Sequence, residues 1–266
     1  MGRMAEPTGD RAVALRGGAS MPILGFGTWQ LRGRDGYGAI RHALDVGYRH
    51  IDTATNYGNE TQVGRALRDS GIPREDVFVT TKLPSGNAGR ERATIDASLR
   101  DLGTEYVDLW LIHWPPGGEA SVPTWRALLD VRRSGKARAV GVSNYSPAQI
   151  DELIDATGDA PAVNQIRWSP AVYDAARLAH SRERGVALEG YSPFQASRLD
   201  DAVLREIADA HGVAPTQVIL RWHVEHGVVV IPKSATPERI ESNHDIFDFS
   251  LTDAEVARID ALSDAS

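Results

Sequence analysis

Short apolar runs recur along the chain and alternate with stretches that have the period of amphipathic helices. The runs, each between four and seven residues long, are Leu24–Thr28, His50–Thr53, Val77–Lys82, Val107–His113, Ala139–Ser143, Ala162–Ile166, Val186–Ser192 and Val228–Lys233. They are rich in β-branched or other apolar residues and have the length of buried strands. Strands that alternate with helices predict a parallel sheet covered by helices.

Helix boundaries are marked between these runs. Ser146-Pro147-Ala148-Gln149 is a capping box with proline at the first helical position, and Thr236-Pro237 begins a helix in the same way. Thr252 and Glu255 predict the start of a short C-terminal helix. Glycines stand where six helices should end, at Gly47, Gly71, Gly103, Gly135, Gly158 and Gly185.

Eight strand–helix repeats in about 240 residues predict a closed (β/α)8 barrel, an α/β fold. The segment Ala12–Pro22 is expected to form a β-hairpin that closes the bottom of this barrel. The alternative, an open doubly wound sheet that binds a dinucleotide, requires a glycine fingerprint after the first strand. Gly25–Gln30 lacks the third glycine and leaves no room for a helix start, and a P-loop is absent. We expect one domain over residues 1–266, with about the first ten residues disordered.

Composition narrows the possible chemistry. The 266 residues carry a formal charge of −7 and include no cysteine, which excludes disulfides, thiolate metal sites and a cysteine nucleophile. The acidic balance argues against nucleic-acid or membrane-surface binding, although a local basic pocket could hold a phosphate. No apolar run is long enough to cross a bilayer, and the N-terminus lacks the apolar region of a signal peptide. We therefore expect a cytoplasmic protein.

Ionisable residues lie at the carboxyl ends of three consecutive predicted strands. These are Asp52, Lys82 and His113, and Tyr57 follows Asp52 in the next loop. Barrel active sites lie at this end, so the four side chains should converge. An ammonium held by a carboxylate can stabilise a phenolate, which makes tyrosine a usable acid, and a neutral imidazole can orient a carbonyl oxygen. This set predicts protonation of an oxygen while a nucleophile attacks its carbon.

No covalent nucleophile accompanies this set, so the attacking species is expected from a cofactor. The other strand ends carry groups suited to binding one. Ser143, Asn144 and Gln165 suit a carboxamide, and Tyr191, followed by Ser192, suits stacking on a flat ring. Lys233, Ser234 and Arg239 stand beside a predicted helix start and suit a phosphate.

The sequence resembles the aldo-keto reductase superfamily, most closely its bacterial 2,5-diketo-gluconate reductase-like members. The resemblance extends from about Met21 to Leu262. It rests on GYRHIDTATNYGNE (47–60), VDLWLIHWP (107–115), GVSNY (141–145), VNQI (163–166), YSP (191–193) and IPKSATPERIESN (231–243).

The resemblance implies NADPH-dependent reduction of aldehydes or ketones without a metal. It implies that Tyr57 donates the proton, that Lys82 and Asp52 tune it, and that His113 orients the substrate carbonyl. In the cofactor site it implies that the carboxamide is held by Ser143, Asn144 and Gln165, that Tyr191 stacks on the nicotinamide, that the 2′-phosphate is bound by Lys233, Ser234 and Arg239, and that Asn243 lies near the adenine. It also implies a monomer.

The chain departs from the family pattern around the substrate pocket. Leu83-Pro84 replaces a common tryptophan after the lysine, and Arg167–Pro170 replaces the common Glu-x-His-Pro. The loop at 115–123 is short, and the chain ends soon after its last helix. Trp29, Tyr57, His113 and Trp114 are still expected to line the pocket, with Phe194 bordering the cofactor tunnel. We therefore expect an open, permissive site for small, keto-sugar-like or diketone-like substrates.

Two rival functions stay open at this stage. One is an NADPH-binding sensor or regulatory barrel in which reductase activity is incidental, since the same fold can host either function. The other is a non-redox barrel enzyme such as an isomerase, which does not explain residues 231–243. His223 and His226 have a metal-compatible helical spacing, but no third ligand is evident and a packed helix face is the preferred interpretation. The sequence leaves open the physiological substrate, the stereochemistry, the reaction direction, the use of NADH and the oligomeric state.

Overall fold

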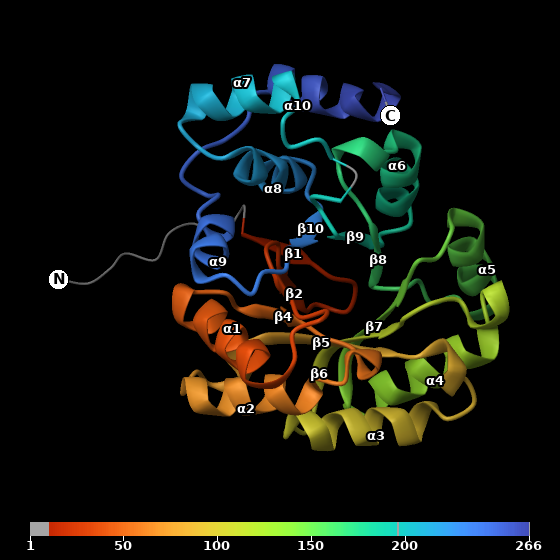
Figure 1. Ribbon diagram of the computed structural model, residues 1–266. Coiled ribbons are helices and arrows are strands. Elements are labelled where there is room, and N and C mark those ends of the chain that lie inside the picture. The colour runs from red at the N-terminus through yellow and green to blue at the C-terminus, as the bar shows by residue number, and fades with distance from the viewer. Residues whose placement is uncertain (1–10, 196, 266) are drawn as a thin grey trace.

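Eight parallel strands form a closed barrel in the computed structural model, which describes residues 11–195 and 197–265. The strands are β3 (Phe26–Gly27), β4 (His50–Asp52), β5 (Phe78–Leu83), β6 (Val107–Ile112), β7 (Ala137–Ser143), β8 (Val163–Arg167), β9 (Ala187–Tyr191) and β10 (Val229–Ile231). Each pairs with its neighbour in chain order, and a parallel bridge from Leu24 to Val230 closes the ring. The predicted barrel is confirmed (Figure 1). The expected disorder of about the first ten residues falls outside the described residues.

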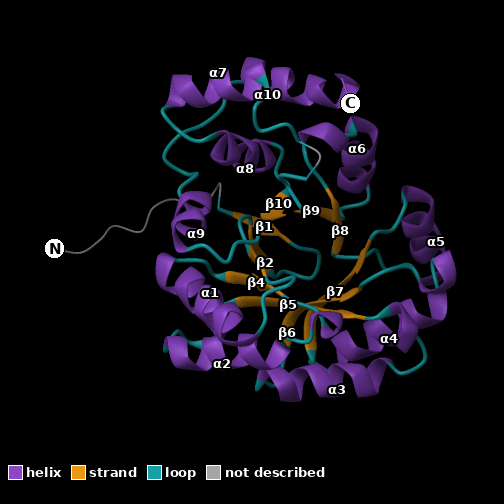
Figure 2. Cartoon of the chain, viewed as in Figure 1, coloured by secondary structure: helices purple, strands orange, loops and turns teal. Residues whose placement is uncertain are grey.

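Helices surround the strands, as Figure 2 shows in purple around orange. They are α1 (Gly33–Val46), α2 (Glu60–Ser70), α3 (Glu91–Leu102), α4 (Val122–Arg133), α5 (Pro147–Thr157), α6 (Ala175–Glu183), α7 (Ala202–His211), α8 (Pro215–Glu225), α9 (Pro237–His244) and α10 (Asp253–Asp260). Two of them go beyond one helix per strand, because α7 precedes α8 in one connection and α10 follows α9. These two lie against each other outside α8. None of the helices in the described ranges is long and apolar enough to span a membrane.

The predicted hairpin is present and closes one end of the barrel. Strands β1 (Ala12–Ala14) and β2 (Ser20–Pro22) pair antiparallel and lie across the ring of strands in Figure 1. Met21 on β2 is fully buried and belongs to one apolar cluster with Phe78 and Leu109 from the barrel strands. The hairpin therefore seals the amino-terminal end of the barrel and leaves the carboxyl end for the polar side chains.

Helix starts and ends follow the local signals in the sequence. The side chains of Ser146 and Thr252 each accept a hydrogen bond from the backbone N–H three residues on, and both capping boxes are complete. Gly71 ends α2 with φ 70°, a left-handed conformation that favours glycine. Helix α10 ends at Asp260, so Leu262 lies in the following 3₁₀ turn, although it still packs against the neighbouring apolar cluster.

The strands differ at their ends from the predicted runs, and the first and last runs each lose three residues. Leu24–Thr28 shortens to β3, Phe26–Gly27, because its flanking residues serve the barrel closure and the next strand. The backbone N–H of Gly25 donates to the carbonyl of Val230 at 2.9 Å, and the hydroxyl of Thr28 donates to the carbonyl of Asp52 at 2.9 Å. A hydrophobic run in the sequence does not show which of its residues pair within the strand and which form hydrogen bonds beyond its ends.

Candidate active site

A cleft of about 590 Å³ opens at the carboxyl ends of the barrel strands. Its lining includes Trp29, Asp52, Asn56, Tyr57, His113, Trp114, Ser143, Asn144, Gln165, Arg167, Tyr191, Ser192, Phe194 and Lys233. All four residues expected in the substrate pocket are among them. Of the residues expected to bind a cofactor, Ser234, Arg239 and Asn243 are not part of this lining. The cleft thus brings together most, though not all, of the residues singled out from the sequence.

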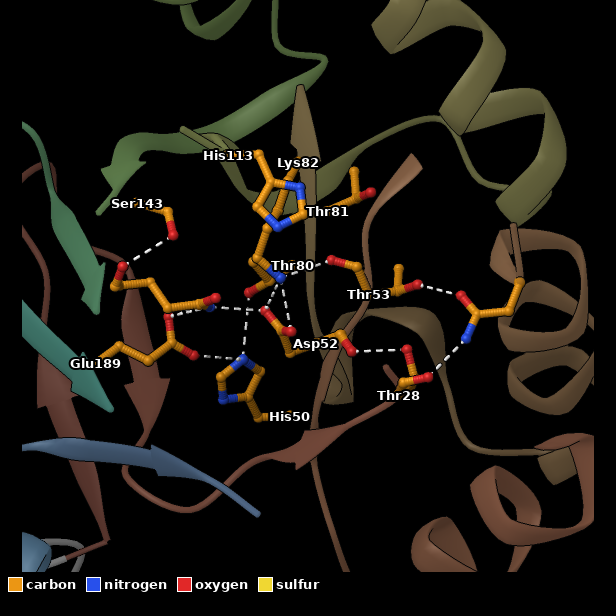
Figure 3. A network of polar contacts seen from close by, with 12 residues as sticks. Thr28, His50, Asp52, Thr53, Thr80, Thr81, Lys82, His113, Ser143 and Glu189 are labelled. Carbon is orange, nitrogen blue, oxygen red and sulfur yellow. Dashed lines mark hydrogen bonds and ion pairs between the residues drawn. The ribbon is translucent and has the colours of Figure 1, made fainter. Parts of the chain in front are cut away.

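Asp52 and Lys82 form a buried ion pair on the floor of the cleft (Figure 3). The ammonium of Lys82 lies 2.7 Å from each carboxylate oxygen of Asp52 and also donates to the carbonyl of Thr53 at 2.9 Å. Burial lowers the pKa of Lys82, but the negative charge of Asp52 and its hydrogen bonds outweigh this effect, and the net pKa is raised. The floor therefore holds a permanent ammonium.

Tyr57 lies close to this ammonium, in the 3₁₀ turn Thr55–Tyr57 that follows β4. The hydroxyl of Thr55 ties the turn to β5 by donating to the carbonyl of Lys82 at 2.9 Å. The ammonium of Lys82 is 5.1 Å from the centre of the Tyr57 ring. Burial raises the pKa of Tyr57 and remains the larger effect, although the charge of Lys82 acts in the opposite direction. Lys82 thus favours the phenolate form against the effect of burial.

The imidazole of His113 stands edge-to-face with Tyr57, with the ring centres 5.7 Å apart. Burial, followed by the positive charge of Lys82, lowers the pKa of His113 to about 3. The ring is therefore neutral at ordinary pH, with one N–H to donate and one nitrogen to accept. Its Nδ1 is buried and has no hydrogen-bond partner among the described residues. A neutral imidazole beside a phenol can hydrogen-bond to an oxygen placed between them.

Hydrogen bonds connect the next strand ends to one another. The hydroxyl of Tyr191 donates to the side-chain oxygen of Asn144 at 2.8 Å, and the Asn144 amide donates to the carbonyl of His113 at 3.1 Å. The hydroxyl of Ser143 donates to the backbone carbonyl of Gln165 at 2.8 Å. Asn144 has φ 64°, an uncommon conformation that this network holds in place. The wall of the cleft next to His113 is therefore ordered before any ligand binds.

Gln165 lies between the carboxyl groups of Asp52 and Glu189. Its Nε2 donates to Asp52 at 2.8 Å and to Glu189 at 2.9 Å, so both amide hydrogens are used inside the protein. Because oxygen atoms of both partners accept these bonds, the side-chain nitrogen of Gln165 must face them. The side-chain carbonyl oxygen of Gln165 is then the group that remains for a ligand. That oxygen fits a ligand amide that donates a hydrogen bond.

A second cluster of residues surrounds the start of α9. Lys233 follows β10 and Arg239 lies in the first turn of α9, and both are exposed. Within the described part of the chain neither forms an ion pair, so two cations remain available for an anion. Ser234 accepts a hydrogen bond from the backbone N–H of Thr236 at 3.0 Å, and Asn243 is buried on α9. Positive side chains beside a helix N-terminus suit a phosphate group.

Two buried residues on the floor were not assigned a role from the sequence. Glu189 on β9 and His50 on β4 are fully buried, and the His50 Nε2 lies 3.7 Å from a Glu189 oxygen. A glutamate in the otherwise apolar run Val186–Ser192 was the signal that could have revealed the first. Burial, followed by the charge of Asp52, raises the pKa of Glu189 to about 8.

His223 and His226 both contact other groups of the protein through their ring nitrogens. His223 is buried, with its ring nitrogens 2.8 Å from the carbonyl of Ile219 and 3.2 Å from that of Trp168. His226 pairs with Asp260 at 2.8 Å. The described residues contain no group of three or more histidine, aspartate or glutamate side chains placed to hold a metal ion. His223 packs on α8, and His226 follows the end of that helix.

Comparisons with known proteins place these observations in a family. The model of the aldo/keto reductase family matches residues 23–264. A 2,5-diketo-D-gluconic acid reductase B from Corynebacterium is 43% identical, covering 94% of this chain and 92% of its own, and a morphine 6-dehydrogenase from Pseudomonas putida is 44% identical, covering 94% and 90%. The crystal structure of a Bombyx mori aldo-keto reductase in complex with NADP superposes with a TM-score of 0.88 at 34% identity, covering 94% and 92%.

Proposed function

The chain belongs to the aldo/keto reductase family, and we propose that it reduces aldehydes and ketones to alcohols with NADPH, using Tyr57 as the proton donor. The family is one of NAD(P)H-dependent oxidoreductases that act on carbonyl and CH–OH groups. The observation that carries the proposal is the buried Lys82–Asp52 pair beside Tyr57, with neutral His113 on the other side of the phenol. A sensor would not need a permanent ammonium beside a phenol.

Each of the four side chains has a defined task in this reaction. Bound NADPH supplies a hydride to the carbonyl carbon. His113, neutral because its pKa is about 3, donates a hydrogen bond that orients the carbonyl oxygen. Tyr57 gives its proton to that oxygen, and the Lys82 ammonium stabilises the phenolate that remains. Asp52 keeps Lys82 charged and in place.

The cofactor residues fit a nicotinamide nucleotide. The free carbonyl oxygen of Gln165, with Ser143 and Asn144, suits the carboxamide, and Tyr191 is held by Asn144 in a position to stack on the ring. Ser192, with φ 55°, directs the chain away from β9. Lys233, Ser234 and Arg239 suit the 2′-phosphate of NADPH at the start of α9, and we assign Asn243, on the same helix, to the adenine. No step of this reaction requires a metal.

The substrate site is open at its rim. Trp29 is 55% exposed and Trp114 is 51% exposed, and Phe194, which also lines the cleft, is half-buried. Exposed aromatic walls accept flat or apolar substrates of different outline. Relatives named for a sugar acid and for morphine match this chain almost equally well. We propose a permissive site for small, diketone-like or keto-sugar-like carbonyl compounds, in a single-domain cytoplasmic monomer.

The test is an NADPH-oxidation screen with aldehydes, diketones, keto-sugars and ketoesters. We expect turnover with several classes in the wild-type protein. Tyr57→Phe serves as the control, and it should bind NADPH as tightly as wild type in a fluorescence titration while its turnover is lost. NADPH binding without turnover on any class would favour the regulatory function instead. Equal turnover in wild type and Tyr57→Phe would contradict the assignment of the proton donor.

A further inference from the structure

Glu189 is an acid buried under the proposed active site. Its Oε2 accepts a hydrogen bond from Gln165 at 2.9 Å, and its Oε1 has no hydrogen-bond partner among the described residues. Among the basic groups of the described residues, His50 is the one within 4.0 Å of Oε1, with its Nε2 at 3.7 Å, which is too long for a hydrogen bond. Figure 3 shows Glu189, His50, Asp52 and Lys82 converging on the barrel interior.

Gln165 connects Glu189 directly to the ion pair. One of its amide hydrogens goes to Glu189 and the other to the same Asp52 that holds Lys82. The strand register supports this bridge, because Gln165 on β8 lies beside Glu189 on β9. A change in the charge of Glu189 is therefore felt by the amide that orients Asp52 as well as through space.

Charge balance decides which acid keeps its proton. The groups that face Glu189 are Asp52 and His50 from β4, Lys82 from β5, Gln165 from β8 and Tyr57 above them, while its neighbour on β10 is the apolar Val229. His50 is neutral, because burial and the charge of Lys82 lower its pKa to about 3. The ammonium of Lys82 can then balance the charge of only one of the two carboxyl groups. Because the site is buried and its charges are not screened by water, the other carboxyl group stays protonated. Asp52 receives both short contacts from Lys82, which leaves the proton to Glu189.

We propose that Glu189 is a positioning residue that carries a proton at neutral pH. In this neutral form it adds no second negative charge beside Lys82, Asp52 and Tyr57, and Tyr57 can donate its proton. This inference rests on the proposed reductase function. Loss of the proton adds a negative charge beside the group, which raises the pKa of both Tyr57 and Lys82 and makes the phenol a weaker acid. Reduction should therefore slow as Glu189 ionises above neutral pH.

The first test follows the proton itself in the protein without cofactor. Nuclear magnetic resonance of protein labelled with ¹³C at the glutamate carboxyl carbons should show one signal that titrates near pH 8. This signal should vanish in Glu189→Gln and persist in Glu60→Gln. Glu60 is the matched control, because it is also buried but receives its hydrogen bond from Thr81, outside the Gln165 bridge. If the signal of Glu189 titrates in the ordinary glutamate range, the proposal is wrong.

The second test is the pH profile of kcat with a carbonyl compound that the wild type reduces. The ratio of the Glu189→Gln rate to the wild-type rate should rise by about threefold or more between about pH 7 and pH 9. The same ratio for Glu60→Gln should stay flat. A flat ratio for Glu189→Gln as well would overturn the proposal. If Glu189→Gln folds poorly, Glu189→Asp replaces it in the test, and because it keeps a carboxyl group it should retain the decline of kcat at alkaline pH. If the wild type reduces nothing, the reductase function fails, while the resonance titration still decides whether Glu189 holds the proton.

Discussion

The floor and the rim of the cleft are built in opposite ways. On the floor, Asp52 is 2% exposed and Lys82 and Glu189 are 0% exposed, and each is held by hydrogen bonds from neighbouring strands. At the rim, Trp29 and Trp114 are 55% and 51% exposed, and Lys233 is exposed as well. The floor comes from the barrel strands, whereas the rim comes from the segments that follow them.

This difference separates two kinds of work. Groups that move a proton must be fixed and shielded from water before the substrate arrives, and the closed barrel provides this. Groups that bind varied substrates need room, and short loops provide it. We therefore expect substitutions on the floor to change stability and kcat, and substitutions at the rim to change binding.

The largest effect should come from breaking the buried ion pair. Asp52→Asn leaves Lys82 buried without its counter-charge and should lower the free energy of unfolding by about 3–5 kcal/mol. The matched control is Asp96→Asn, which breaks the ion pair between Asp96 and Lys136. The side chain of Lys136 is 41% exposed and that of Asp96 is 55% exposed. That change should cost about 0–1 kcal/mol. Urea unfolding of both variants makes the comparison, and equal losses would contradict the claim that burial makes the Asp52–Lys82 pair the more important of the two.

Acid should destabilise the protein through histidines buried in neutral form. The pKa of His113 is about 3 in the folded protein, below its ordinary value of about 6.5. As pH falls below about 6.5, the unfolded chain takes up a proton that the folded protein refuses, so stability declines by up to about 1.4 kcal/mol per pH unit for such a group. Urea midpoints from pH 7 downward should therefore fall less steeply in His113→Gln than in wild type. Parallel slopes would show that His113 is not held neutral.

At the exposed start of α9, Arg239→Gln should separate the two nicotinamide cofactors. If Arg239 binds the 2′-phosphate, its loss removes a charge-assisted contact of about 1.5–3 kcal/mol and weakens NADPH binding by roughly tenfold to a hundredfold. NADH lacks this phosphate and should bind nearly as before. Arg258→Gln is the control, because Arg258 pairs with Glu206 away from the cleft and should affect neither cofactor. Equal weakening of both cofactors would contradict the assignment.

Strand-end chemistry was predictable from the sequence because it depends on local alternation. Asp52, Lys82 and His113 each end an apolar run, and neighbouring parallel strands must present their carboxyl ends at one edge. The confirmed hairpin and both capping boxes likewise depend on residues close in the chain.

The interior network could not be predicted in this way. Gln165 reaches Asp52 across 113 residues of sequence, a contact that depends on barrel closure and register. Alternation could place Glu189 on the inner face of its strand, but it could not show which carboxyl group it would meet. The short first strand also depends on packing around the closed ring.

The most direct test of the separation between floor and rim is to measure kcat and KM for Tyr57→Phe and Trp114→Ala on the same set of carbonyl substrates. Tyr57→Phe should lower kcat by about 10²–10⁴-fold on every substrate and leave their order unchanged. Trp114→Ala should change KM by about tenfold, the equivalent of ~1.4 kcal/mol of lost contact, by amounts that reorder the substrates at nearly constant kcat. A uniform loss of kcat in Trp114→Ala, or a reordering in Tyr57→Phe, would contradict this account.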